Sequence, residues 1–355
     1  MFHQAQKTWA ARCGRLSALL LAAVAGWAGA AAGPDELNVQ SYPGTTLSLP
    51  LYVGQAKGIF EKNGLKVNIV GIPAGPQATQ ALLTGGVDIM GNSVSNTLLA
   101  QAKLAKSGSS DRIIGIIQGE SGLHYSLMGQ GSINWPAQGD VKAIVQALKG
   151  KTVGVTAVGA DTQQVVEGLM KMHGADPKSV TFIAVASGAS AYAAFDAKHV
   201  DTIVGWAPTQ TVIGDRGAKM LIDFRKGDAG PSFSPWTVLT YQALKSNVDK
   251  SPERFTRFQK AIEEATAYAK DPKNLDELVG IFSKSGATGL TPDQLRRAIA
   301  EYQPLYETKF DCKLLPVEFA FYSKYAGSLS EGDAATCDQY MWSGAKAYML
   351  NNTGK

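Results

Sequence analysis

Histidine and cysteine are scarce in this 355-residue chain, which has four histidines and three cysteines. Beyond residue 32 the only histidines are His124, His173 and His199, and they form neither a His-Glu-x-x-His motif nor a pair at zinc-ligand spacing. The sequence also lacks a Gly-x-Ser-x-Gly nucleophile motif and a complete phosphate-binding loop. We therefore expect no metal, no cofactor and no catalytic residue, and we predict that the protein is not an enzyme.

A large excess of charge of either sign is also missing. The formal net charge is +4. Three of the positive charges, Lys7, Arg12 and Arg15, lie in an N-terminal stretch without acidic residues, so the rest of the chain carries only about +1. Nucleic-acid binding needs a concentrated basic surface. We expect no nucleic-acid partner, and with no sign of oligomerisation in the sequence we expect a monomer.

The N-terminal stretch has the pattern of a secretory signal. A basic start is followed by the apolar run Leu16 to Ala28, which is short and rich in small residues, and then by Ala30-Ala-Ala32. We predict that residues 1–32 are a signal peptide cleaved near Ala32, and that the mature protein is periplasmic. A retained membrane anchor is the alternative.

Strand-like and helix-like segments alternate along most of the chain, which predicts an α/β fold with parallel-rich sheets. The extended runs 124–128 and 236–241 are interpreted as two crossings between two lobes. Lobe 1 would then comprise residues 33–124 and 236–355 and include a helical C-terminal tail, and lobe 2 would comprise residues 125–235. Ser251-Pro252 and Thr291-Pro292 each predict the start of a helix in the tail.

Cys312 and Cys337 are the two cysteines that remain after the predicted cleavage. Disulfides form and persist in oxidising compartments outside the cytoplasm. We therefore predict a disulfide between them. Two buried free thiols are the alternative.

Four blocks of sequence occur in a recognisable order and spacing. They are PLYVGQAKGIFEKNGLKV (50–67), PAGPQ (73–77), LLTGGVDIMGNS (82–93) and VDTIVGWAP (200–208). In these blocks the chain resembles the sulfonate/nitrate/taurine-type solute-binding proteins of bacterial ABC importers. The resemblance implies a two-lobed, type II periplasmic binding protein fold that binds a small-molecule ligand between its lobes and delivers it to an ABC permease in the inner membrane.

Two alternatives share this fold. One is a ligand sensor. The other is a binder of thiamine-pyrimidine precursors or an enzyme acting on them, although the cysteine-rich cluster of the thiamine-pyrimidine synthases is missing here.

Small and polar residues follow several of the predicted strands, where α/β proteins gather ligands at helix N-termini. Turn formation and helix capping would equally explain these residues, and Asp161 with Gln164 three positions later fits an N-cap. Carried over by position from the resemblance, the predicted ligand-binding residues are Thr45, Thr46, Gln77, Asn92 and Ser93 in lobe 1, and Gly159, Ala160, Asp161, Thr162, Gly188, Trp206 and Pro208 in lobe 2.

Two departures from the sulfonate binders bear on the ligand. Ala207 replaces the acidic residue of their Trp-Asp-Pro run, and Gly159 to Asp161 stands where they favour serines. We expect a small organic solute, such as a sulfonate or carboxylate, with the acidic Asp161 favouring a zwitterionic or aromatic compound. Trp206 suits either stacking on a planar ligand or core packing. Glu120 and His124 have no assigned role at this stage.

Overall fold

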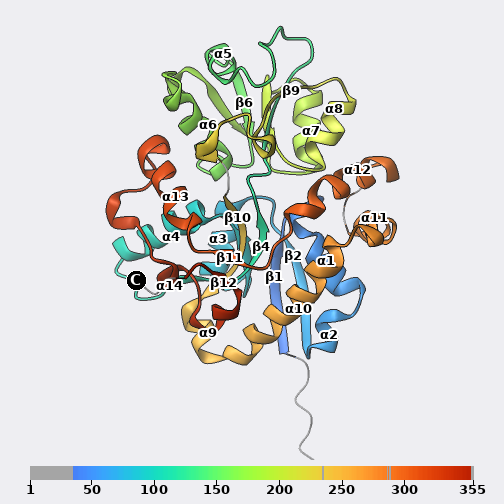
Figure 1. The fold of residues 1–355 in the computed structure, drawn as a ribbon, viewed down its shortest axis with the longest axis vertical. Helices are drawn as coiled ribbons and strands as arrows, with labels where there is room; N and C mark the ends of the chain where they lie inside the picture. The colour runs from blue at the N-terminus through green and yellow to red at the C-terminus, as the bar shows by residue number, and fades with distance from the viewer. Residues whose placement is uncertain (1–34, 234–235, 286, 288, 353–355) are drawn as a thin grey trace, which may run out of the picture. The chain divides into compact units, whose positions relative to one another are not determined.

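Strand β10 (Thr237–Leu244) lies between β3 (Met90–Asn92) and β4 (Ile113–Ser121), and it is antiparallel to both (Figure 1). The structure is a computed structural model that describes residues 35–233, 236–285, 287 and 289–352. β1 (Asp35–Ser41) pairs in parallel with β2 (Leu65–Gly71), and a bridge from Val39 to Ile89 leads from β1 towards β3. These strands therefore combine the beginning of the described chain with a segment nearly two hundred residues later.

A second sheet has the strand order β7-β6-β8-β5-β9. β6 is parallel to β7 and β8, whereas β5 is antiparallel to β8 and β9. β5 and β10, which contain most of the two predicted crossings, are thus the strands that run against their neighbours. The α/β fold is confirmed, with one reversed strand in the three-stranded sheet and one in the five-stranded sheet. The bounds are β5 (Ser126–Gly129), β6 (Thr152–Val155), β7 (Thr181–Ala184), β8 (Thr202–Gly205) and β9 (Lys219–Asp223).

The longest helix among the described residues, α10 (Pro252–Lys270), packs against the sheet through one apolar face. Its buried residues Phe255, Phe258, Ile262 and Ala265 recur every three or four positions and form one apolar stripe. The stripe packs against α1 (Leu49–Ala56), β2 and β4.

The remaining helices cover the described chain as follows: α2 (Ile59–Lys62), α3 (Gly75–Leu83), α4 (Val94–Lys106), α5 (Val141–Ala147), α6 (Asp161–Met172), α7 (Ala189–Asp196), α8 (Thr209–Asp215), α9 (Lys245–Lys250), α11 (Leu275–Lys284), α12 (Pro292–Tyr302), α13 (Leu314–Phe321) and α14 (Cys337–Tyr340). The predicted helical C-terminal region is therefore confirmed.

Both helix starts predicted in this region are confirmed. Ser251 is the N-cap of α10, although its side chain makes no capping bond. Thr291 caps α12 with a full capping box, because its Oγ1 accepts from the backbone N of Gln294 at 3.2 Å and Gln294 Oε1 accepts from the backbone N of Thr291 at 3.0 Å.

The predicted signal peptide lies outside the described residues. The described residues from 35 onwards belong to one compact unit, and the lobe boundaries near residues 124 and 235 stay predictions. Among the residues that the structure describes, no helix has the length and apolar character needed to cross a membrane.

The disulfide between Cys312 and Cys337 is confirmed. The two Cα atoms are 5.5 Å apart, and the bridge spans 25 positions of sequence. Cys312 follows β11 (Phe310–Asp311), which pairs with β12 (Met349–Leu350), and Cys337 opens α14. The bridge therefore closes a loop of chain that contains α13.

Replacing both cysteines with serine is expected to lower the free energy of unfolding by about 3 kcal/mol, because the unfolded chain regains the entropy of a loop of this length. Urea denaturation of the oxidised protein and the double variant measures the difference. A reductant should destabilise the wild type and leave the variant unchanged. Equal stability of the two proteins in the absence of reductant would contradict the prediction.

Candidate ligand-binding site

A cavity opens where several strands of both sheets end. Its volume is about 20 Å³, which is enough for a water molecule, so a small organic ligand enters only when the walls move apart. Strand ends and helix starts supply most of its walls, as expected for an α/β protein. The lining residues are Tyr42, Leu47, Gly75, Asn92, Ser93, His124, Tyr125, Thr156, Asp161, Trp206, Val238 and Leu239.

Asp161 is the acidic residue of this lining. Its Oδ2 accepts a hydrogen bond from the Tyr125 hydroxyl, and its Oδ1 accepts one from the backbone N of Thr162 at 2.9 Å. Burial raises the pKa of the Asp161 carboxyl, while hydrogen bonds from Tyr125, Thr162 and Ser93 act in the opposite direction. Because the surrounding groups donate hydrogen bonds, they favour the ionised, acceptor-only form of the carboxyl group.

The prediction that Asp161 is the N-cap of a helix is wrong by one residue. The N-cap of α6 is Ala160, and Asp161 is the first residue of the helix. The physical reason is that Tyr125 and Thr162 occupy the two carboxylate oxygens, so neither oxygen caps the helix. The carboxylate still lies at the positive end of the helix dipole, which favours its negative charge.

Aromatic rings form another wall of the cavity. The Trp206 ring lies 6.4 Å from Tyr42, 5.6 Å from Tyr125 and 5.5 Å from His124, measured between centroids. Trp206 is only 5% exposed, and its Nε1 has no hydrogen-bond partner among the residues that the structure describes. The ring therefore packs among other aromatic rings, and its stacking on a planar ligand stays a prediction.

None of the cavity-lining residues is a lysine or an arginine. Asn92 is used by the fold, because its Nδ2 donates to Gly75 O at 3.1 Å and to Thr79 Oγ1 at 3.0 Å. Its Oδ1 accepts from Asn96 Nδ2 and from the backbone N of Ser93. Gly75 allows this close approach, since an added Cβ would lie 2.7 Å from Asn92 Oδ1. Asp161, the acidic residue of the lining, therefore has no lysine or arginine beside it in the cavity wall.

Four of the predicted site residues, Asn92, Ser93, Asp161 and Trp206, line the cavity. Of the others, Gln77 and Gly159 are exposed. The remaining predicted residues are buried near the cavity without lining it: Thr45, Thr46, Ala160, Thr162, Gly188 and Pro208.

Some of these buried residues have clear structural roles. Thr46 donates to Ala207 O from its Oγ1 at 3.1 Å and from its backbone N at 3.3 Å. Thr162 Oγ1 accepts from the backbone N of Thr156 at 3.2 Å. Gly188 has φ +63°, and an added Cβ would lie 3.0 Å from Pro43 O, so glycine permits a close backbone approach there.

Sequence reasoning missed most of the aromatic wall. Tyr42 directly follows β1, and Tyr125 directly precedes β5 within the first predicted crossing. Their positions beside polar strand ends were the available signal, because side chains at those ends share one edge of the fold.

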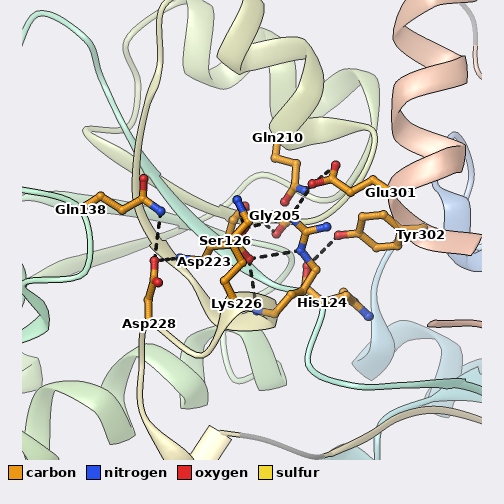
Figure 2. Close-up of polar contacts among 11 residues, drawn as sticks. His124, Ser126, Gln138, Gly205, Gln210, Asp223, Lys226, Asp228, Glu301 and Tyr302 are labelled. Atoms are coloured by element: carbon orange, nitrogen blue, oxygen red, sulfur yellow. Dashed lines mark hydrogen bonds and ion pairs between the residues drawn. The ribbon is translucent and has the colours of Figure 1, made fainter. Parts of the chain in front are cut away.

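Arg225 forms a polar junction beside the cavity. Its guanidinium contacts Asp223 Oδ2 at 3.0 Å and Oδ1 at 3.2 Å, and it also binds Glu301 on α12. Figure 2 shows Glu301 meeting Gln210 of α8, and the Tyr302 hydroxyl donating to His124 O at 2.6 Å. The junction thus connects α12 with α8, with the end of β9 and with the segment between β4 and β5.

Glu318 belongs to α13, and its buried carboxyl group contacts the start of β10. Its Oε1 accepts hydrogen bonds from both the backbone N and the Oγ1 of Thr237. Burial raises the pKa of Glu318 from the ordinary 4.5 to about 8. The folded protein therefore holds this proton more tightly than the unfolded chain does, and the resulting stability is present below pH 4.5 and is lost as the pH rises to about 8.

The free energy of unfolding of the wild type, measured relative to a Glu318→Gln variant, should fall between pH 5 and pH 8 and stay level above pH 8. Urea denaturation of both proteins over this range measures the difference. Glu331→Gln, on an exposed turn, serves as the control and should show no such trend. A difference between wild type and Glu318→Gln that does not change with pH would contradict the prediction.

Comparison with known families identifies the chain. A sequence profile described as NMT1/THI5-like matches residues 45–274, well over half of the 355 residues. The chain belongs to the NMT1/THI5-like family. The resemblance seen in the four sequence blocks is thereby confirmed.

Two further comparisons concern a curated relative and a solved structure. YtlA of Bacillus subtilis (strain 168), provisionally named a binding protein, is 25% identical over 259 residues, which cover 72% of this chain and 71% of YtlA. The alkanesulfonate-binding protein SsuA from Xanthomonas axonopodis pv. citri, solved with MOPS, is 19% identical with a TM-score of 0.66, over 84% of this chain and 94% of SsuA. The periplasmic binding protein fold is therefore confirmed.

The same fold also occurs in an enzyme. The desulfurization enzyme DSZB is 12% identical to this chain, with a TM-score of 0.57 over 87% of this chain and 96% of DSZB. Fold alone therefore does not separate binding from catalysis.

Proposed function

We propose that this NMT1/THI5-like protein is the exported solute-binding component of an ABC importer, and that it captures a small organic solute in the cavity lined by Asp161 and Trp206. The cavity's chemistry carries the proposal: it combines a buried carboxylate, aromatic walls and no lining cation. A carboxylate favours an amine or another hydrogen-bond donor on the solute, whereas it repels nitrate or a simple sulfonate. The solute is therefore a zwitterion or an aromatic compound with a donor group.

Capture would work by closure of the two predicted lobes. Three hydrogen bonds join residues that are assigned to different lobes. Thr46 donates to Ala207 O, Ser187 Oγ donates to Pro73 O at 3.2 Å, and Gln210 donates to Glu301. A solute that touches both lobes binds the closed form more tightly than the open form and shifts the population towards it. The closed form then docks on the permease, and other subunits hydrolyse ATP.

The proposed location and partners follow from the same account. The signal sequence directs the protein to the periplasm and is removed near Ala32. The protein acts there as a monomer whose partners are the solute and the inner-membrane permease.

An enzyme on the same fold is the second candidate. Two observations favour it: the fold is shared with DSZB, and His124, which lines the cavity, forms a buried pair with Glu120 that has no hydrogen-bond partner among the described residues. Capture and catalysis differ in one measurable respect, which is whether the solute is recovered unchanged.

A thermal-shift screen tests the proposal. The panel contains nitrate, butanesulfonate, benzoate, 4-aminobutyrate, 4-(aminomethyl)benzoate and 4-amino-2-methylpyrimidine, each at about 10 mM, because a ligand raises the melting temperature by mass action. We expect amine-bearing compounds to raise it and to be recovered unchanged after incubation. A panel without any shift, or the appearance of a product, would contradict the proposal.

A further inference from the structure

Glu120 and His124 form a buried pair whose polar atoms are unused. Each side chain is 1% exposed, and His124 Nδ1 lies 3.4 Å from Glu120 Oε2. Among the described residues, neither carboxyl oxygen and neither ring nitrogen has a hydrogen-bond partner. Buried polar atoms nearly always have partners, because an unsatisfied one costs about 1–3 kcal/mol. Glu120 Oε2 and His124 Nδ1 face each other and can satisfy one another, whereas Glu120 Oε1 and His124 Nε2 indicate a group that the protein itself does not supply.

The pair adjoins the cavity at one end. His124 lines the cavity beside Trp206, whose Nε1 is also buried without a partner. Tyr125 separates this end from Asp161, because its ring lies 4.8 Å from the His124 ring and its hydroxyl donates to Asp161. The nitrogens of His124 and the carboxylate of Asp161 are thus separated by about the length of the Tyr125 side chain.

The protonation of the pair follows from its burial. Burial raises the pKa of the Glu120 carboxyl well above its ordinary value. Burial, and secondarily the charge of Arg225, lowers the pKa of His124 to about 3. The His124 ring is then uncharged at neutral pH. Glu120 Oε2 faces its Nδ1 at 3.4 Å, and burial favours a proton on that carboxyl, so we assign Nδ1 as the acceptor of the ring and Nε2 as the nitrogen that carries the hydrogen.

The two ends of the cavity therefore have opposite polarity. The His124 end offers two N–H donors and lies within the field of the Arg225 guanidinium. The Asp161 end offers a carboxylate. A ligand matching both ends has an acceptor group at one end and an amine at the other.

We propose that His124 Nε2–H and Trp206 Nε1–H together bind the carboxylate of an amino acid-like solute, whose amine binds Asp161. In this arrangement Glu120 is a positioning residue, which fixes the tautomer and orientation of the His124 ring. The inference rests on the proposed function and adds to it the ligand class and the direction in which the ligand lies.

Matched probes test the two ends separately. The set is 4-(aminomethyl)benzoate, 4-methylbenzoate, which lacks the amine, and 4-methylbenzylamine, which lacks the carboxylate. Calorimetric titration at pH 7 should show that the bifunctional compound binds roughly 10- to 100-fold tighter than either half, as expected for hydrogen bonds to charged groups.

Two variants locate the carboxylate contact. In His124→Phe and in Trp206→Phe the advantage of 4-(aminomethyl)benzoate over 4-methylbenzylamine should shrink roughly 10-fold, while the affinity for the amine alone changes little. Trp206→Phe removes a donor that no protein atom uses, so it keeps the test valid if His124→Phe does not fold. Trp135→Phe is the matched control, because Trp135 Nε1 donates to Gln130 O at 3.0 Å and does not line the cavity.

The positioning role of Glu120 has its own readout. Nitrogen NMR of the His124 ring should report the Nε2–H tautomer in the wild type and a changed tautomer balance in Glu120→Gln, whose amide both donates and accepts.

Three results would overturn the inference: equal affinity for the bifunctional compound and one of its halves, an unchanged advantage in both variants, or no binding of any of the three. The proposed function fails separately, when no member of the wider panel binds.

Discussion

Asp161→Asn is expected to weaken the binding of 4-(aminomethyl)benzoate roughly 100-fold, as for the loss of one partner from a buried, hydrogen-bonded charge pair. The substitution keeps the size of the side chain but removes the negative charge that faces the amine. Because burial already opposes that charge, the variant should remain folded and melt near the wild-type temperature. Calorimetric titration, with a melting curve for each protein, measures both effects.

The same substitution should change selectivity. Without the carboxylate, 4-methylbenzoate should bind at least as well as it does to the wild type, because a repulsive group has been removed. Asp176→Asn is the control, since Asp176 caps a short helical turn away from the cavity. Unchanged affinity in Asp161→Asn would place the amine-binding site elsewhere.

Arg225→Met is expected to lower the free energy of unfolding by about 3 kcal/mol. Asp223 is 1% exposed and depends on the Arg225 guanidinium, so the substitution leaves a buried carboxylate with little compensation. The value is at the low end of the range for breaking a buried ion pair, because the backbone N of Arg225 still donates to Asp223 at 3.1 Å. Urea denaturation at pH 7 measures the loss.

Lys226 provides a matched control for Arg225. Its Nζ lies 3.7 Å from the same Asp223 carboxylate, but its side chain is 70% exposed. Lys226→Met should therefore change the stability by less than about 1 kcal/mol, as for exposed ion pairs. Similar losses in the two variants would mean that the buried geometry around Arg225 contributes nothing.

Local sequence signals determined most of the elements. Ser251 with Pro252 located the start of α10, and Thr291 with Pro292 located the start of α12. The pairing of strands was not accessible in this way, because the position of β10 between β3 and β4 depends on contacts between residues about 120 to 150 positions apart. Such contacts leave no periodic pattern in the sequence.

The site was predictable in outline and not in detail. Polar strand ends located Ser93 and Asp161, which line the cavity, because strand geometry brings such ends together, while their binding role stays a prediction. Gln77 lies in a matching sequence block yet is exposed on α3, since the direction of a helical side chain depends on how the helix packs. The Glu120–His124 pair could not be interpreted from sequence, because its significance lies in burial and in missing partners.

The central claim is that this NMT1/THI5-like protein holds a donor-bearing solute in the cavity between Asp161 and Trp206 and releases it unchanged. A crystal structure of the protein with the tightest-binding compound of the screen tests it most directly. The account predicts electron density for the intact compound in that cavity, with its amine on Asp161. Density for the compound at another place, or for a reaction product in the cavity, would contradict the account.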